Sequence, residues 1–281
     1  MVKEKTKINL FDLIYTINIL CIVLIPIFLC VVNAFKSNID IFSDFIALPE
    51  NIDISNFVYL IDKRNILLYI FNSLKITLIV LTITSIINPF IAYKISINWD
   101  KKIYRFLYIA ISSAMLIPSK VIIFPLIKIY YNLGLMNTFG LIIYYTVFMI
   151  PEMVFLYVPY FKMFSKDLKN AAIIDGSTEF TFYKDVFLPI CKPIIITGAI
   201  LITIWTWNDF FMPLMILNKN PDSWTLPIFI YNFMGKFSAH KNYAFAACVF
   251  SLIPISVFYI LFHKKILSGF EIKNDKRVEI K

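Results

Sequence analysis

Residues 13–32 read LIYTINILCIVLIPIFLCVV and contain no charged side chain. A helix that crosses a lipid bilayer needs about 20 predominantly apolar residues, and this run meets that length. It is longer than the apolar core of a secretory signal peptide, and no clear small-residue cleavage site follows it. We therefore interpret it as an uncleaved first membrane span.

Five further apolar runs follow, so that the six candidate spans cover about residues 13–33, 71–92, 103–125, 139–161, 193–217 and 243–263. Pro118 and Pro125 interrupt the end of the third run, which membrane helices tolerate when neighbouring groups satisfy the freed carbonyls. Strands of a membrane barrel would need only about 10 alternating residues. The sequence therefore predicts an all-α polytopic membrane protein with six transmembrane helices in a single domain over residues 1–281.

The composition excludes most soluble classes of protein. Hydrophobic residues make up 59% of the 281 and charged residues 16%, against about 45–50% and about 25% in ordinary soluble domains. The four cysteines form no CxxC pair, and His240 and His263 lie in no zinc-binding pattern, so we expect no metal site. The net charge of +9 is not carried by basic runs interleaved with aromatic residues, so we expect no nucleic-acid partner.

The distribution of Lys and Arg predicts the orientation of the chain in the membrane. Eighteen of the 27 lie in segments 1–12, 93–105, 162–192 and 264–281, and eight lie in segments 33–70, 119–138 and 218–242. Cytoplasmic loops carry the excess of positive charge. We therefore expect both termini of this lipid-bilayer protein to be cytoplasmic.

No motif for nucleotide binding or catalysis occurs in the chain. None of the six glycines completes the phosphate-binding pattern GxxxxGK[ST], so we expect no catalytic residue and no cofactor bound by this chain. A carrier driven by an ion gradient would be expected to bury several ionisable groups, and only Lys75, Glu152 and Asp209 qualify. An ion-coupled secondary transporter stays open as an alternative, as does a membrane enzyme, which would need clustered catalytic side chains.

The segment 162–192 is predicted to form two short helices on the cytoplasmic face. Ser165 can cap the first helix, and Gly176 is expected to end it. We expect Ser177 to cap the second helix and Leu188-Pro189 to end it. The segment is too polar to insert, and its amphipathicity suits lipid headgroups and a protein partner equally well.

Residues 170–189, NAAIIDGSTEFTFYKDVFLP, resemble the EAA loop of ABC importer permeases. The family pattern is EAA, three residues, Gly, nine residues, and Ile-x-Leu-Pro. The family's glutamate is Asn170 here, and a neutral hydrogen bond is about half as strong as a charge-assisted one, so coupling through this position would be weaker or compensated elsewhere. The resemblance implies an ATPase-coupling loop that includes Asn170, Ala171, Ala172, Asp175, Gly176, Leu188 and Pro189.

The resemblance extends from about residue 56 to residue 269. The run WTWNDFFMPLMIL at residues 205–217, followed by Thr225-Leu226-Pro227, is similar to the carbohydrate-uptake branch of the family. The resemblance implies the ABC importer type I permease fold, with a core at residues 68–263. It also implies sugar translocation by alternating access, although a solute such as a glycerol phosphate ester stays open.

The same resemblance implies that the chain lies in a bacterial cell (inner) membrane, and it implies the partners of the chain. They are a second permease subunit, expected to form a heterodimer with this one, two ATP-binding subunits that hydrolyse the ATP, and an extracytoplasmic solute-binding protein.

Four residues are candidates for the solute path. A carboxylate such as Asp209, deep in the fifth apolar run, costs at least about 2.5–3.5 kcal/mol on insertion scales, so it should face protein or water. Trp207 and Asn208 beside it offer a stacking surface and an amide, which suit a sugar, and Glu152 follows Pro151, which opens a helix locally. The alternative for Asp209 is a packing hydrogen bond to the partner subunit.

Overall fold

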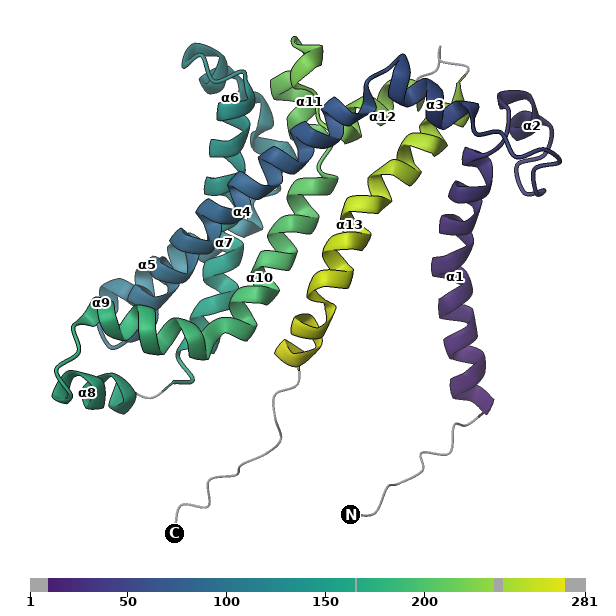
Figure 1. Cartoon of the computed structure of the whole chain (residues 1–281). Helices are drawn as coiled ribbons and strands as arrows, with labels where there is room; N and C mark the ends of the chain where they lie inside the picture. Colours follow the sequence, from purple (N-terminus) through teal and green to yellow (C-terminus); the bar gives the residue numbers. More distant parts are fainter. Residues whose placement is uncertain (1–9, 165, 235–239, 271–281) are drawn as a thin grey trace. The chain divides into compact units, whose positions relative to one another are not determined.

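The computed structural model describes residues 10–164, 166–234 and 240–270, and the regular elements in these residues are helices (Figure 1). They divide into two compact units. Unit 1 comprises Met1–Leu67 and Phe229–Ser256, and unit 2 comprises Leu68–Ile228 and Val257–Lys281. A single domain over residues 1–281 with a permease core at 68–263 stays a prediction.

Unit 1 contains α1 (Leu10–Ala34), α2 (Asn38–Ser43), α3 (Ser55–Asp62) and parts of α12 (Leu226–Met234) and α13 (Lys241–Phe270). Its central polar residue is Asn56 of α3, which is buried. The Asn56 amide donates to the carbonyl oxygens of Ala34 (3.0 Å) and Lys36 (2.9 Å), and the Asn242 amide donates to Asn56 Oδ1. Because a buried amide requires such partners, Asn56 fixes α3 against the end of α1 and the start of α13.

Unit 2 contains most of α4 (Ile66–Ile97), α5 (Lys102–Ser113), η1 (Ala114–Leu116), α6 (Ser119–Asn132), α7 (Thr138–Phe161), α8 (Lys166–Ile174), α9 (Glu179–Thr181), η2 (Phe182–Phe187), α10 (Leu188–Asn208), α11 (Phe211–Leu217) and η3 (Pro221–Ser223). Helices α8 and α9 lie at one end of this unit, and α6 and α11 lie at the other (Figure 1). The apolar core runs along α7, where Leu141, Met149 and Val154 are buried. Helix α10 packs closely on α7 at Gly198, since a Cβ atom there would overlap the hydroxyl of Tyr157.

Four helical segments of the described residues are long and apolar enough to cross a membrane: Leu13–Ala34, Ile66–Ile97, Thr138–Phe161 and Lys241–Phe258. Two further candidates are bent pairs, Lys102–Leu116 with Lys120–Asn132 (100°) and Glu179–Ile190 with Lys192–Asn208 (77°). Counting each pair as one span gives six. The prediction of an all-α chain with six apolar crossings is confirmed in this form.

The third and fifth predicted spans are not continuous helices. Residues 103–125 are divided between α5 and α6, because Ile117 is extended (φ −83°, ψ 114°) before Pro118, as sterics before a proline favour. Residues 193–217 are divided at Asp209, whose own backbone is extended (φ −69°, ψ 125°). The break leaves α11 as a separate short helix, and a candidate site lies beside it.

Candidate functional site

The first half of the segment 162–192 has the conformation that the sequence predicts. Helix α8 is followed by Gly176 with a positive φ of 85°. The amide of Gly176 donates to the Ile173 carbonyl (3.0 Å), and the amide of Ser177 donates to the Ala172 carbonyl (2.9 Å). These bonds satisfy carbonyls that would otherwise be unpaired at the helix end. Gly176 therefore ends α8, as predicted, while Ser165, the predicted cap, lies outside the described residues.

The second half differs from the prediction. The cap of α9 is Thr178 rather than Ser177, since Thr178 Oγ1 accepts from the Thr181 amide. Leu188-Pro189 does not end the helix. Pro189 instead lies in the first turn of α10, directly after the π-helical η2. A proline is tolerated in a first turn, where its missing N–H is not needed, so the chain continues as a helix bent by 77°.

We call residues Glu179–Ile190, which comprise α9, η2 and the start of α10, the arm. Aromatic side chains hold the arm against α4 and α7. Phe182, Tyr183 and Phe187 are buried. The ring of Tyr93 on α4 lies 4.8 Å from the rings of both Tyr183 and Phe187, and Phe161 on α7 lies 4.9 Å from Phe187 between ring centroids. Such offset or edge-on pairs contribute about 0.5–1.5 kcal/mol each beyond their buried area. The arm is therefore held by packing against two long helices.

Ion pairs add a second attachment. Glu179 Oε1 lies 3.1 Å from Lys94 Nζ and 3.4 Å from Lys169 Nζ. The hydrogen bond from Lys94 is the main cause that holds the pKa of the Glu179 carboxyl below its ordinary value, and the charge of Lys169 acts in the same direction. Glu179 thus joins α9 to α8 and to α4. Lys94 was not predictable from the sequence, because nothing local relates residues so far apart in the chain.

Helix α8 has one packed side and one open side. Leu168 and Ala172 pack against the core, whereas Asn170 and Ala171 are exposed. Ile174 is 85% exposed at the end of the same helix. We call the exposed surface formed by Asn170, Ala171, Ile174, Asp175 and Gly176 the knob surface. The sequence-predicted residues Asn170, Ala171, Asp175 and Gly176 therefore share one surface, while Leu188 and Pro189 belong to the arm behind it.

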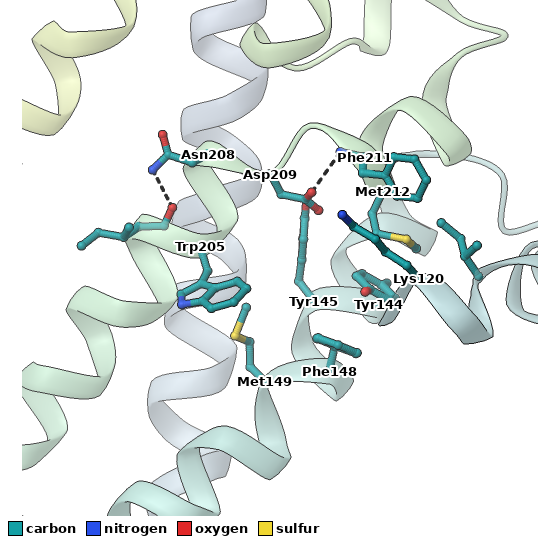
Figure 2. Close-up of a pocket in the computed structure, with 12 residues that line it drawn as sticks. Lys120, Tyr144, Tyr145, Phe148, Met149, Trp205, Asn208, Asp209, Phe211 and Met212 are labelled. Atoms are coloured by element: carbon teal, nitrogen blue, oxygen red, sulfur yellow. Dashed lines mark hydrogen bonds between the residues drawn. The ribbon is translucent and has the colours of Figure 1, made fainter. Parts of the chain in front are cut away.

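A pocket of about 380 Å³ opens at the break between α10 and α11 (Figure 2). Its walls come from α6, α7, α10 and α11. The lining residues are Lys120, Ile123, Tyr144, Tyr145, Phe148, Met149, Ile204, Trp205, Asn208, Asp209, Phe211 and Met212. Most of this lining is apolar or aromatic, with its polar groups at one end, which is the usual make-up of a small-molecule site.

Asp209 is fixed by hydrogen bonds within its own chain. The Tyr145 hydroxyl donates to Asp209 Oδ2 (2.9 Å), and the amide of Phe211 donates to Oδ1 (3.0 Å; Figure 2). The carboxyl group therefore supports the start of α11 and connects it to α7. This packing bond lies within the chain, whereas the alternative predicted from the sequence was a bond to the partner subunit, which stays a prediction.

The structure divides the four predicted solute-path residues. Asn208 and Asp209 line the pocket. Trp207 is 5% exposed, and neither Trp207 nor Glu152 on α7 is among the lining residues. The indole in the pocket is Trp205, which the sequence analysis did not select. Spacing could have identified it, because residues three and four apart share a helix face, which places Trp205 beside Asn208.

Comparison with known proteins identifies the family. Residues 89–270 match the family described as "Binding-protein-dependent transport system inner membrane component". The Streptococcus mutans "Multiple sugar-binding transport system permease protein MsmG" is 35% identical over 95% of this chain and 97% of its own length. The "Probable starch degradation products transport system permease protein AmyC" of Thermoanaerobacterium thermosulfurigenes is 29% identical over 87% and 88%.

A solved structure shares the fold. It is a bacterial ABC transporter involved in the import of the acidic polysaccharide alginate, whose matching chain is 22% identical with a TM-score of 0.75 over 90% of this chain and 94% of that one. The matched relatives are transport permeases rather than enzymes. The all-helical fold, the apolar crossings and the family match agree. This chain is a multi-pass membrane protein that belongs to the family of inner membrane components of binding-protein-dependent transport systems.

Proposed function

We propose that this chain is the membrane-spanning permease subunit of an ATP-driven ABC importer that translocates a carbohydrate. Relatives named for sugars and for starch degradation products align with 95% and 87% of the chain, respectively. This agreement extends over the whole membrane-spanning region rather than a single motif. The solute class is therefore carried over to this chain from relatives of the same architecture.

Two structural features together support the proposed coupling mechanism. The knob surface is exposed, and the arm behind it is firmly held. Ile174 is 85% exposed, and an exposed large apolar side chain on a polar helix is typical of an interaction surface. Behind it, Glu179 and the buried aromatic residues fix the arm to α4 and α7. A push on the knob surface would therefore move these helices rather than only deform a loop.

The proposed cycle follows from this attachment. Two ATP-binding subunits dock on the knob surfaces of this chain and of a second permease subunit, and their closure on ATP draws the knobs together. The attached helices respond as rigid bodies, so that the solute path opens toward an extracytoplasmic solute-binding protein. Hydrolysis of ATP by the partner subunits then resets the path. The excess of Lys and Arg in alternate loops supports cytoplasmic termini and a cytoplasmic knob surface.

Asn170 limits the type of hydrogen bond that the knob surface can make with the ATPase. It is exposed at the position of the glutamate in the family pattern and offers only a neutral hydrogen bond, about half as strong as a charge-assisted one. Ile174 on the same helix supplies apolar area in addition. We therefore expect docking to depend more on apolar burial than on an ion pair.

Purification of the tagged chain from its native membrane in mild detergent tests the proposal. The expected co-purifying proteins are an ATPase with a phosphate-binding loop and a second polytopic permease. Their ATPase activity should rise when the solute-binding protein and a sugar are added. A chain that purifies alone, with no associated ATPase activity, would contradict the proposed function.

A further inference from the structure

The pocket of Figure 2 has the size of a small-molecule site and several aromatic side chains in its walls. Its volume of about 380 Å³ lies within the range of about 300–1,000 Å³ found for ligand pockets. The rings of Tyr144 and Phe148 stack on each other, with centroids 5.1 Å apart and planes at 20°. Both residues line the pocket from α7. Trp205 contributes an indole from α10.

Such walls favour one class of ligand. A sugar ring presents apolar C–H groups on its faces and hydroxyl groups around its edge. Aromatic faces bind the apolar side, so the edge must be met by hydrogen-bonding groups. In the pocket, these groups are at the break between α10 and α11, where Asn208 and Asp209 lie (Figure 2).

Asp209 is oriented to accept a further hydrogen bond. A carboxylate has about four acceptor positions. Two are used by the Tyr145 hydroxyl and by the backbone amide of Phe211. About two therefore remain for a ligand hydroxyl, and the two existing bonds fix the direction of the carboxyl group before the ligand arrives. Preorganisation of this kind lowers the cost of binding.

The charges of the pocket distinguish neutral from anionic ligands. Asp209 is a partly buried acid, so a ligand carboxylate or phosphate beside it would be repelled. Lys120 also lines the pocket, but its side chain is exposed, and water screens an exposed charge so that it contributes only about 0–1 kcal/mol. The buried acid therefore dominates.

The geometry points to a binding site for one ring of a neutral carbohydrate in this chain itself, with the ring against Tyr144, Phe148 and Trp205 and a hydroxyl on Asp209. This inference rests on the proposed function and deepens it. It assigns part of the solute selection to the permease rather than to the external binding protein, and it predicts rejection of acidic sugars.

The test uses the complete permease complex in lipid nanodiscs without the solute-binding protein. The probes are maltotriose and raffinose, both neutral, and trigalacturonate, an anion of similar length. Tryptophan emission and titration calorimetry measure binding. The variants are Trp205→Phe, Phe148→Leu, Asp209→Asn and the control Phe155→Leu, which makes the same change on α7 at an exposed residue outside the pocket lining.

We expect at least one neutral probe to give a saturable change in emission that disappears in Trp205→Phe. Phe148→Leu should weaken its binding about tenfold, equivalent to about 1.4 kcal/mol, and Phe155→Leu should leave it unchanged. Trigalacturonate should bind only to Asp209→Asn.

Three results would overturn the inference: no saturable binding of either neutral probe, equal effects of Phe148→Leu and Phe155→Leu, or binding of trigalacturonate by the unmodified chain. If the complex still contains the ATPase and the second permease in any of these cases, the proposed function stands and only the pocket assignment fails.

Discussion

The hydroxyl of Tyr145 donates a 2.9 Å hydrogen bond to Oδ2 of Asp209, and this bond joins α7 to the break between α10 and α11. Asp209 also accepts from the amide of Phe211, at the start of α11. The carboxyl group therefore satisfies a backbone donor that the break would otherwise leave unpaired. A fixed helix break beside a pocket is a consequence of this one side-chain pair.

Tyr145→Phe should destabilise unit 2. The change leaves Asp209 without its side-chain donor, and hydrogen bonds to charged groups contribute about 1.5–3 kcal/mol. The thermal unfolding temperature of the purified complex should fall, with folding and membrane insertion retained. Tyr144→Phe is the matched control, because it removes a neighbouring hydroxyl from the same pocket and keeps this bond. Equal unfolding temperatures for the two variants would show that the Tyr145–Asp209 bond contributes no stability.

Gly176→Val should abolish uptake while the protein still inserts into the membrane. Gly176 has a φ of 85°, and a Cβ atom there would meet nothing within 4 Å, so the change acts on backbone conformation alone. A left-handed conformation costs a residue with a side chain roughly 1–2 kcal/mol, and more for a β-branched one. Gly176→Asn is the control, because Asn tolerates this conformation and should retain most uptake. Normal uptake by the Val variant would remove the turn from the mechanism.

Glu179→Gln should weaken the coupling of transport to ATP hydrolysis and lower the thermal stability of the protein only slightly. Its contacts with Lys94 and Lys169 are 3.1 and 3.4 Å, but the Glu179 side chain is 45% exposed. Ion pairs so exposed contribute about 0.2–1 kcal/mol. We expect a small change in unfolding temperature but a several-fold lower ratio of solute transported to ATP hydrolysed. Asp185→Asn, the same kind of change at an exposed residue of η2, should leave that ratio unaltered. An unaltered ratio in Glu179→Gln as well would exclude this ion pair from coupling.

The attachment through Glu179 should also depend on pH in a defined direction. The Lys94 contact holds the pKa of Glu179 below its ordinary value, which is about 4.3. A lowered pKa stabilises the folded arm at every pH above about 4.3, and the effect is lost as the pH falls through the folded value. A spin label at Ile174→Cys, with the four native cysteines replaced by serine, should keep the same mobility from pH 7 to about pH 5 and become more mobile below about pH 4.3. Loosening between pH 7 and pH 5, or the same curve in Glu179→Gln, would contradict this account.

The sequence predicts the apolar crossings because their signal is local. Runs of about 20 apolar residues identify α1, α4, α7 and α13 with errors of only a few residues at most of their ends. The sequence prediction fails where the conformation of one residue interrupts the helix within an apolar run. Ile117 before Pro118 divides the third span, and Asp209 divides the fifth by bonding to its own α11 and to Tyr145. The partner Tyr145 is 64 residues away in the chain, so hydropathy alone cannot indicate that break.

In the coupling loop, too, the sequence predicts only the features that depend on local residues. Gly176 is predictable because the turn that ends α8 depends on one residue's conformation. Leu188-Pro189 misleads, because a proline that usually ends a helix also fits the first turn of a new one, and only the preceding π-helical η2 decides between them. The Lys94–Glu179 pair and the position of Trp205 in the pocket depend on tertiary packing, which the spacing of local motifs does not encode.

Uptake by proteoliposomes tests the central claim most directly. The purified permease and its co-purifying subunits are reconstituted with the solute-binding protein, loaded inside with ATP, and supplied outside with labelled maltotriose or raffinose. Ionophores abolish all ion gradients. The account predicts uptake that requires internal ATP, persists with ionophores, and is lost in Gly176→Val. Uptake that continues without ATP and stops when the ionophores are added would show a transporter driven by an ion gradient and would contradict the account.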